Sequence, residues 1–166
     1  MNQAILKQKE AVVDEVIALA KEANAIVVVE YRGMSVADIS TLRRTLRGLN
    51  AKMGVYKNSM VRRASDALNY QGFEAHLSGP NAFVFCPDPI EGSKAIVKFA
   101  RRNGILQVKG GVIEGRVLDA DGIKNVANLP GKLGLVSMFL SCIQSPIRSF
   151  AATVQAVVDT KQSPAN

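Results

Sequence analysis

Residues 25–63 read AIVVVEYRGMSVADISTLRRTLRGLNAKMGVYKNSMVRR, and the succession of patterns in this stretch sets the expected fold. The unbroken apolar run at 25–29, which is β-branched from Ile26 onward, predicts a strand that is covered on both faces. Ser35, followed three residues later by Asp38, predicts the start of a helix, because such side chains satisfy free amides of the first turn. A strand followed at once by a helix, and then by the same pair again, indicates an α/β fold.

The alternation continues on both sides of this stretch up to about residue 130. The other expected elements are a helix at 5–20, a strand at 51–56, a helix that is capped by 57–59 and runs to about 68, a strand at 81–86, a helix at 89–102, strands at 105–109 and 112–118, and a helix at 120–128. We expect Gly110–Gly111 to form the turn between the last two strands, and 129–131 to end the domain. The expected fold is a mixed sheet of about five strands flanked by helices, over residues 1–130.

Residues 32–63 also concentrate positive charge. They carry eight basic side chains against one acid, Asp38, and this surplus of seven equals the net charge of the whole chain. A basic surplus in one segment favours a polyanionic partner, because each Lys or Arg that binds a phosphate releases condensed counterions. The alternative is a solvated helix face, the usual role of a charge run. The basic residues are Arg32, Arg43, Arg44, Arg47, Lys52, Lys57, Arg62 and Arg63.

The two strands of this stretch suggest how the cations could gather. If these strands are neighbours, two helix N-termini lie at one edge of the sheet, beside Arg32 and Lys57, and both groups favour phosphate. Tyr31 and Tyr56 are the only aromatic candidates for base stacking, and either could belong to the core. The pattern therefore favours folded RNA recognised through its shape and backbone.

A different pattern occupies the chain after residue 130, where apolar residues recur every three or four positions. They are Leu135, Phe139, Ile143, Ile147, Phe150, Val154 and Val157. This spacing predicts a long, extended helix over 131–161, followed by a disordered tail at 162–166. The apolar stripe of such a helix needs a surface that covers it, because large apolar patches are rarely left exposed to water. It could fold back on the domain or, because Pro146 should kink it into two halves, bind two copies of a partner in series.

Other function classes fit the sequence less well. The apolar stretch 133–158 is interrupted at 144–148, and neither half reaches the roughly 20 residues of a membrane span. His76, the single histidine, has no nucleophile pattern beside it, and no phosphate-binding glycine motif is present. Cys86 and Cys142 match neither a disulfide framework nor a zinc site. Together with the lack of a leader pattern, these features lead us to expect a cytoplasmic protein without catalytic activity, metal or cofactor.

Five motifs extend along the chain: VVEYRGMSV at 28–36, LRRTLR at 42–47, YKNSMVRRA at 56–64, GPNA at 79–82 and LPGK at 129–132. In this order they resemble the L ten family of bacterial large-subunit ribosomal proteins, the stalk-base proteins related to the archaeal and eukaryotic P-zero proteins. Met34 and Met60 stand where Leu is more usual, a change that conserves volume.

The resemblance implies a domain over 1–130 that binds 23S-type ribosomal RNA beside the neighbouring protein L eleven. It also implies that the helix over 131–161 holds two dimers of the acidic stalk protein, L seven/L twelve, which recruit translational GTPases. Some relatives repress their own messenger RNA. By analogy, the residues at the RNA surface are Arg32, Gly33, Lys57, Asn58, Arg62 and Arg63, and the apolar stripe holds the dimers. Arg43 and Arg47 join the RNA candidates because they lie four apart on one side of their helix. The alternative is a stand-alone RNA-binding regulator or chaperone.

Overall fold

The computed structural model describes the backbone of residues 3–162 and the side chains of residues 7–160. The chain divides into two compact units, Met1–Leu129 and Pro130–Asn166, and each is described by itself. The disordered tail that we predicted at 162–166 lies outside the described residues, apart from the backbone of Gln162, which ends the last helix.

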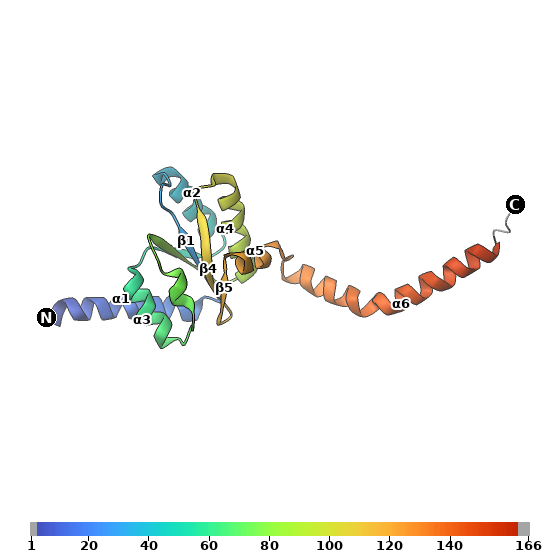
Figure 1. Ribbon diagram of the computed structural model, residues 1–166, viewed down its shortest axis with the longest axis horizontal. Helices are drawn as coiled ribbons and strands as arrows, with labels where there is room; N and C mark the ends of the chain where they lie inside the picture. Colours follow the sequence, from blue (N-terminus) through green and yellow to red (C-terminus); the bar gives the residue numbers. More distant parts are fainter. Residues whose placement is uncertain (1–2, 163–166) are drawn as a thin grey trace. The chain divides into compact units, whose positions relative to one another are not determined.

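The first unit is a five-stranded sheet with helices on both faces (Figure 1). Its elements are α1 (Gln3–Glu22), β1 (Ala25–Glu30), α2 (Val36–Arg47), β2 (Lys52–Gly54), α3 (Asn58–Ala67), a short 3-10 helix η1 (Phe73–His76), β3 (Asn81–Cys86), α4 (Pro89–Asn103), β4 (Gln107–Ile113), β5 (Arg116–Asp119) and α5 (Ala120–Asn128). The second unit contains α6 (Lys132–Gln162). The predicted α/β class, the five strands and the long C-terminal helix are confirmed.

The strand order is β2-β3-β1-β4-β5, and each of these neighbouring pairs is antiparallel. The expectation of a mixed sheet is therefore wrong, and so is the condition that the first two strands are neighbours. β1 and β2 run in the same direction, but β3 lies between them. β3 is buried along all six residues, so its backbone needs partners on both edges, and the place between β1 and β2 supplies them.

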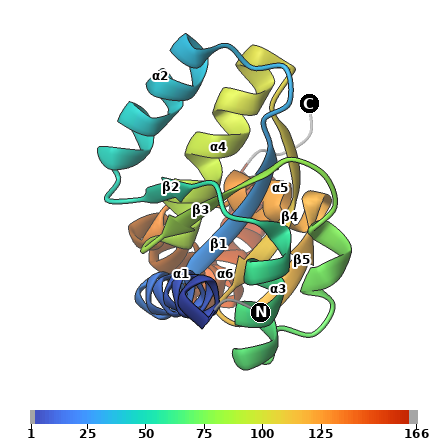
Figure 2. The same cartoon turned by 90° about the vertical axis from the view of Figure 1, so that its left-hand side faces the viewer.

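Side chains of β1 alternate between two cores. Ala25, Val27 and Val29 pack on one face of the sheet with Leu42 of α2 and Ile96 of α4. The other core contains Ile26 and Val28 of β1, together with side chains of α1, α3 and η1: Val16, Ala20, Val61, Ala64 and Phe73. Figure 2 shows α2 and α4 on one side of the sheet and α1 and α3 on the other. The two helices of the basic segment thus cover opposite faces.

β4 passes straight through Gly110–Gly111, so the turn predicted there is wrong. The turn lies at Glu114 and Gly115, with φ angles of 50° and 79°. The glycines serve close packing instead. A Cβ on Gly110 would lie 2.7 Å from the carbonyl oxygen of Leu118, and one on Gly111 would overlap the carbonyl oxygen of Ile26.

Gly111→Ala should therefore lower the free energy of unfolding of the first unit by about 1 to 3 kcal/mol, because the added methyl meets backbone on a buried strand. Urea denaturation followed by tyrosine fluorescence measures this, since Tyr31, Tyr56 and Tyr70 all lie in that unit and the chain has no tryptophan. Gly48→Ala is the matched control, because Gly48 has a helical φ of −62° and an ordinary contact of 3.4 Å at the Cβ position. Equal stability of both variants would refute the packing role of Gly111.

Candidate functional site

The start of α2 is built as the sequence predicts. The hydroxyl of Ser35 accepts a hydrogen bond from the Asp38 amide at 3.2 Å and donates one to the Asp38 carboxylate at 2.7 Å. Gly33 has a φ of +88°, which lets the chain turn from β1 into the helix and leaves Arg32 exposed. The carboxylate of Asp38, the single acid of the basic segment, is thus engaged at the cap.

Asn58 holds the start of α3 against the β3 side of the sheet. We predicted a cap formed by 57–59, but Lys57 is the capping residue and makes no side-chain cap bond. The Asn58 amide instead donates to the carbonyl of Gly79 at 2.9 Å, and its oxygen accepts from Asn81 at 3.4 Å. Asn81 is buried and pairs with Glu30, the last residue of β1. The end of β1 and the start of α3 therefore meet through β3, although β1 and β2 are not neighbours.

Lys109 fixes the loop that carries this junction. Its ammonium group lies 2.6 Å from the Glu30 carboxylate and donates to the carbonyl of Ser78 at 2.6 Å. Both members of the ion pair are about three-quarters buried, with side chains 21% and 23% exposed. The polar contacts of Lys109 and Asn58 thus hold both ends of loop 78–81 in place. Sequence reasoning missed Asn81 and Lys109, although the GPNA motif pointed to this loop.

The structure separates seven of the eight cations of residues 32–63 into two groups, and Arg44 belongs to neither. Arg43 and Arg47 of α2 line one hollow with Lys52, Ala51 and Met53. We call Arg43, Arg47 and Lys52 the α2 group. The junction group lies where β1 ends and α3 begins, and consists of Arg32, Gly33, Lys57, Asn58, Arg62 and Arg63. Because α2 and α3 cover opposite faces of the sheet, the candidate residues do not form one patch.

Within the junction group, Arg62 forms an ion pair with another side chain of this chain. Its guanidinium donates to the carboxylate of Glu74, in the same hollow as Asn58 and Ser59. This hydrogen bond, with the attraction between the charges, holds the pKa of Glu74 below and that of Arg62 above their ordinary values. Arg63 is exposed and makes no ion pair within the described part of the chain.

Both tyrosine candidates for base stacking are partly buried. Tyr56 packs edge-on against Phe85, with ring centroids 6.3 Å apart, and donates its hydroxyl to Glu15 at 3.1 Å. Burial, followed by the contact with Glu15, raises the pKa of Tyr56. Tyr31 packs against the core beneath α2. The site offers cations and amides, which suit a phosphate backbone more than exposed bases.

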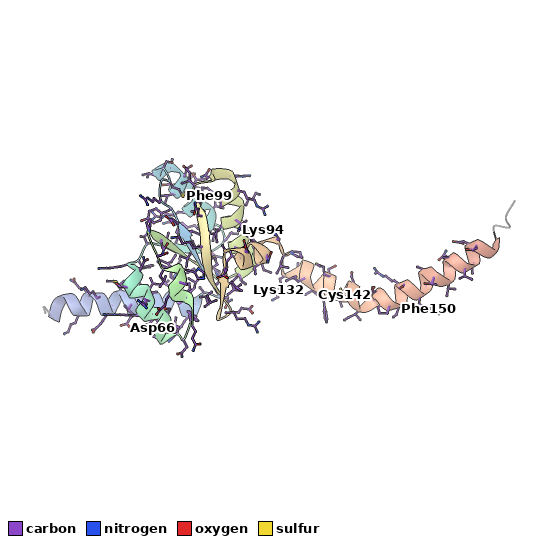
Figure 3. All side chains as sticks on the ribbon, viewed as in Figure 1. Asp66, Lys94, Phe99, Lys132, Cys142 and Phe150 are labelled. Atoms are coloured by element: carbon purple, nitrogen blue, oxygen red, sulfur yellow. The ribbon has the colours of Figure 1, made fainter. Side chains whose placement is uncertain are left out.

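The predicted stripe lies on one uninterrupted helix, α6, which continues through Pro146 (Figure 1). A proline inside a helix removes one backbone hydrogen bond and can bend the axis without ending the helix. Phe139 is 66% exposed, Ile147 73% and Phe150 72%. Figure 3 shows the side chains of α6, with Cys142 and Phe150 labelled. A single helix cannot bury its own apolar side chains, so this stripe needs a covering surface.

This continuity corrects the argument from length against a membrane span. The 29 helical residues Lys132–Thr160 contain an 18-residue stretch with a mean hydropathy of 1.2, and they are long and apolar enough to cross a bilayer by length and composition alone. Arg148 and Asp159 lie on the face opposite the stripe at 100° per residue, and Arg148 donates to Gln144 at 2.9 Å.

In the part of the chain that the structure describes, no three His, Cys, Asp or Glu residues come together in a group that could hold a metal ion. His76 lies 3.2 Å from Asp119, and Cys86 is buried among apolar side chains.

Comparisons with known proteins cover both units. A family model described as Ribosomal protein L10 matches residues 4–101, and one described as Ribosomal protein uL10 C-terminal region matches residues 129–164. The large ribosomal subunit protein uL10 of Lactobacillus johnsonii is 40% identical over 164 residues, which cover 97% of this chain and 99% of the relative. The proteins of the same name from Bacillus licheniformis and Shouchella clausii are 39% and 41% identical, and the matches cover 98% and 95% of this chain and 98% and 96% of those proteins.

The two cysteines should react very differently with iodoacetamide at pH 8. Cys86 should stay unmodified until the protein unfolds, because burial, with a smaller contribution from Asp88, raises the pKa of its thiol to about 12. Cys142 is exposed and should be alkylated in the native protein. Intact-mass measurement with and without urea gives the number of modified thiols. Two modified thiols in the native protein would contradict the burial of Cys86.

Proposed function

Since this chain belongs to the ribosomal protein L10 family, and is therefore a structural, non-enzymatic component of the large subunit of the cytoplasmic ribosome, we propose that it joins ribosomal RNA to the acidic stalk protein. The first unit binds 23S-type RNA, next to the protein L eleven. The second unit, α6, holds two dimers of L seven/L twelve. The protein thereby raises the local concentration of the domains that recruit translational GTPases.

One observation carries the RNA-binding half of the proposal. All eight cations of residues 32–63 are exposed, while apolar side chains between them, such as Leu42, Leu46 and Val61, are buried. The core thus fixes the elements from which the cations project. Surface arginines and lysines on rigid elements can neutralise a phosphate backbone with little loss of conformational freedom in the main chain. The packed tyrosines favour recognition of a folded RNA through backbone and shape.

The exposed stripe of α6 supports the partner-binding half. Leu135, Phe139 and Ile143 precede Pro146, and the remaining stripe residues follow it: Ile147, Phe150, Val154 and Val157. An amphipathic helix of this kind binds in an apolar groove of a partner. We assign one dimer to each side of Pro146, as in the family members that carry two dimers.

A bilayer is the second candidate for covering α6, because the helix is long and apolar enough. Arg148 lies two residues from the midpoint of Lys132–Thr160, and an arginine at the centre of a spanning helix costs about 2.5 to 3.5 kcal/mol. A groove in a partner protein covers the stripe alone and leaves Arg148 and Asp159 in water. Because the charged residues of α6 lie on one face and the apolar stripe on the other, a protein partner is favoured over a bilayer.

A stand-alone RNA-binding regulator is the alternative for the whole chain. Such a protein would keep the junction group and lose nothing when the residues after Leu129 are removed. Repression of its own messenger RNA fits within the proposal, since the RNA-binding unit would serve both targets.

Lys57→Gln with Arg63→Gln should weaken binding to large-subunit RNA and reduce the slope of log affinity against log salt by roughly 1 to 2, because each lost phosphate contact releases about one counterion fewer. Fluorescence anisotropy across a salt series measures the slope. Lys94→Gln with Lys98→Gln on α4 removes the same charge from exposed positions outside the basic segment, and should keep the wild-type slope. Identical slopes in both double variants would rule out Lys57 and Arg63 as phosphate ligands.

Glu74→Gln should strengthen RNA binding, because it frees Arg62 from its carboxylate partner. Glu91→Gln, which removes an exposed acid from α4, controls for the change in net charge. If both variants gain affinity equally, Arg62 does not contact the RNA.

Phe139→Asp and Phe150→Asp should each abolish the binding of one stalk dimer, since each places a charge within one half of the apolar stripe. Ser141→Asp and Ala152→Asp, on the opposite face of α6, should keep both dimers. Native mass measurement counts the bound copies, and protection of Cys142 from alkylation gives a second readout. Retention of both dimers by the two Phe variants would refute the assignment of the stripe.

A further inference from the structure

The α2 group has its own place in the fold, away from the junction group. Arg43 and Arg47 are four residues apart in α2, so their side chains share one side of the helix. Lys52 begins β2, an edge strand, and lines the same hollow, although its ammonium group contacts Glu22 of α1 on the other face of the sheet. All three cations are exposed, and the other residues that line the hollow, Ala51 and Met53, are uncharged.

The strand registers separate the two groups along the sheet. Lys52 pairs with Phe85, which pairs with Ile26 near the start of β1. Asn58 contacts Asn81, which pairs with Glu30 at the end of β1. Four residues of strand correspond to about 13 Å. Because α2 and α3 also cover opposite faces, one short run of phosphates that contacts the junction group cannot reach the α2 group as well.

Local structure explains these cations only in part. Basic residues in the last turn of a helix stabilise its C-terminal dipole, which accounts for Arg44 and Arg47. It does not account for Arg43, or for Lys52 on another element. Lys52 does contact Glu22 at 3.4 Å, but with side chains 65% and 72% exposed this surface pair is weak and can be exchanged for another anion.

We propose that Arg43, Arg47 and Lys52 form a second phosphate-binding site, which takes an RNA backbone segment separate from the one at the junction group. This rests on the proposed RNA-binding function and adds that the first unit bridges two segments of RNA. The guanidinium groups of Arg43 and Arg47 match phosphate oxygens in two-pronged geometry, and the ammonium group of Lys52 joins them when it exchanges Glu22 for the phosphate. The hollow offers little apolar surface, which disfavours an acidic protein segment as its occupant.

The test uses the full chain and two RNA duplexes of about 16 base pairs, the length that a double-stranded RNA-binding domain spans, one carrying a donor and one an acceptor fluorophore. At low salt the wild-type protein should bind one of each and give energy transfer, with two duplexes per chain by native mass measurement. Arg43→Gln with Arg47→Gln should bind one duplex and lose the energy transfer. Lys57→Gln with Arg63→Gln should also bind one, and the fourfold variant should bind neither.

Lys94→Gln with Lys98→Gln is the matched control, since α4 covers the same face of the sheet as α2 (Figure 3 labels Lys94). This variant should keep both duplexes, and equal loss would show that net charge, not a site, holds the second RNA.

A single duplex on the wild-type protein, with an unchanged salt slope in the Arg43/Arg47 variant, would overturn the second site and leave RNA binding at the junction intact. Failure of the wild-type protein to bind either duplex would instead overturn the proposed RNA-binding function. Displacement of only the second duplex by polyglutamate, with tighter binding of polyglutamate than RNA, would assign the α2 group to an acidic protein and overturn the proposal.

Discussion

Enclosure of β1 is the constraint on which the rest of the first unit depends. Val27, Val28 and Val29 have no exposed surface, β3 and β4 occupy both edges of the strand, and helices cover both of its faces. A strand buried in this way gives up all contact with water, so its backbone and side chains need partners in every direction. In this fold, α2 covers one face of the strand and α3 covers the other. The distribution of the surface cations follows from that requirement of the core.

Polar contacts have a complementary role where β1 ends. The pair between Glu30 and Lys109, and the amide contacts of Asn58 with Gly79 and Asn81, join three strands and a helix at one point. Partly buried charges are stabilising only when they are paired, and these are. The result is a fixed loop next to exposed cations. A scaffold in a large assembly gains from such rigidity, because little ordering is left to be done on binding.

Much of this could be predicted from the sequence where the cause is local. The hydroxyl of Ser35 and the carboxylate of Asp38 act within one helical turn, and the stripe of α6 depends only on helical spacing. The errors concern contacts that are distant in sequence. Whether Gly110–Gly111 is a turn or a close approach depends on Ile26 and Leu118, and the position of β3 depends on which strand must be covered on both edges. The engagement of Arg62 depends on Glu74, twelve residues further on.

Continuity of α6 through Pro146 links the geometry of its two halves. In one uninterrupted helix, the number of residues between two anchors sets both their separation and their relative direction. Phe139 and Phe150 are eleven residues apart, about three turns and about 16 Å, so they return to nearly the same side. An insertion of one residue between them would swing one anchor by about 100° around the axis. The helix can therefore be lengthened, with its docking sites kept on one side, only by steps close to a whole number of turns, such as seven, eleven or eighteen residues.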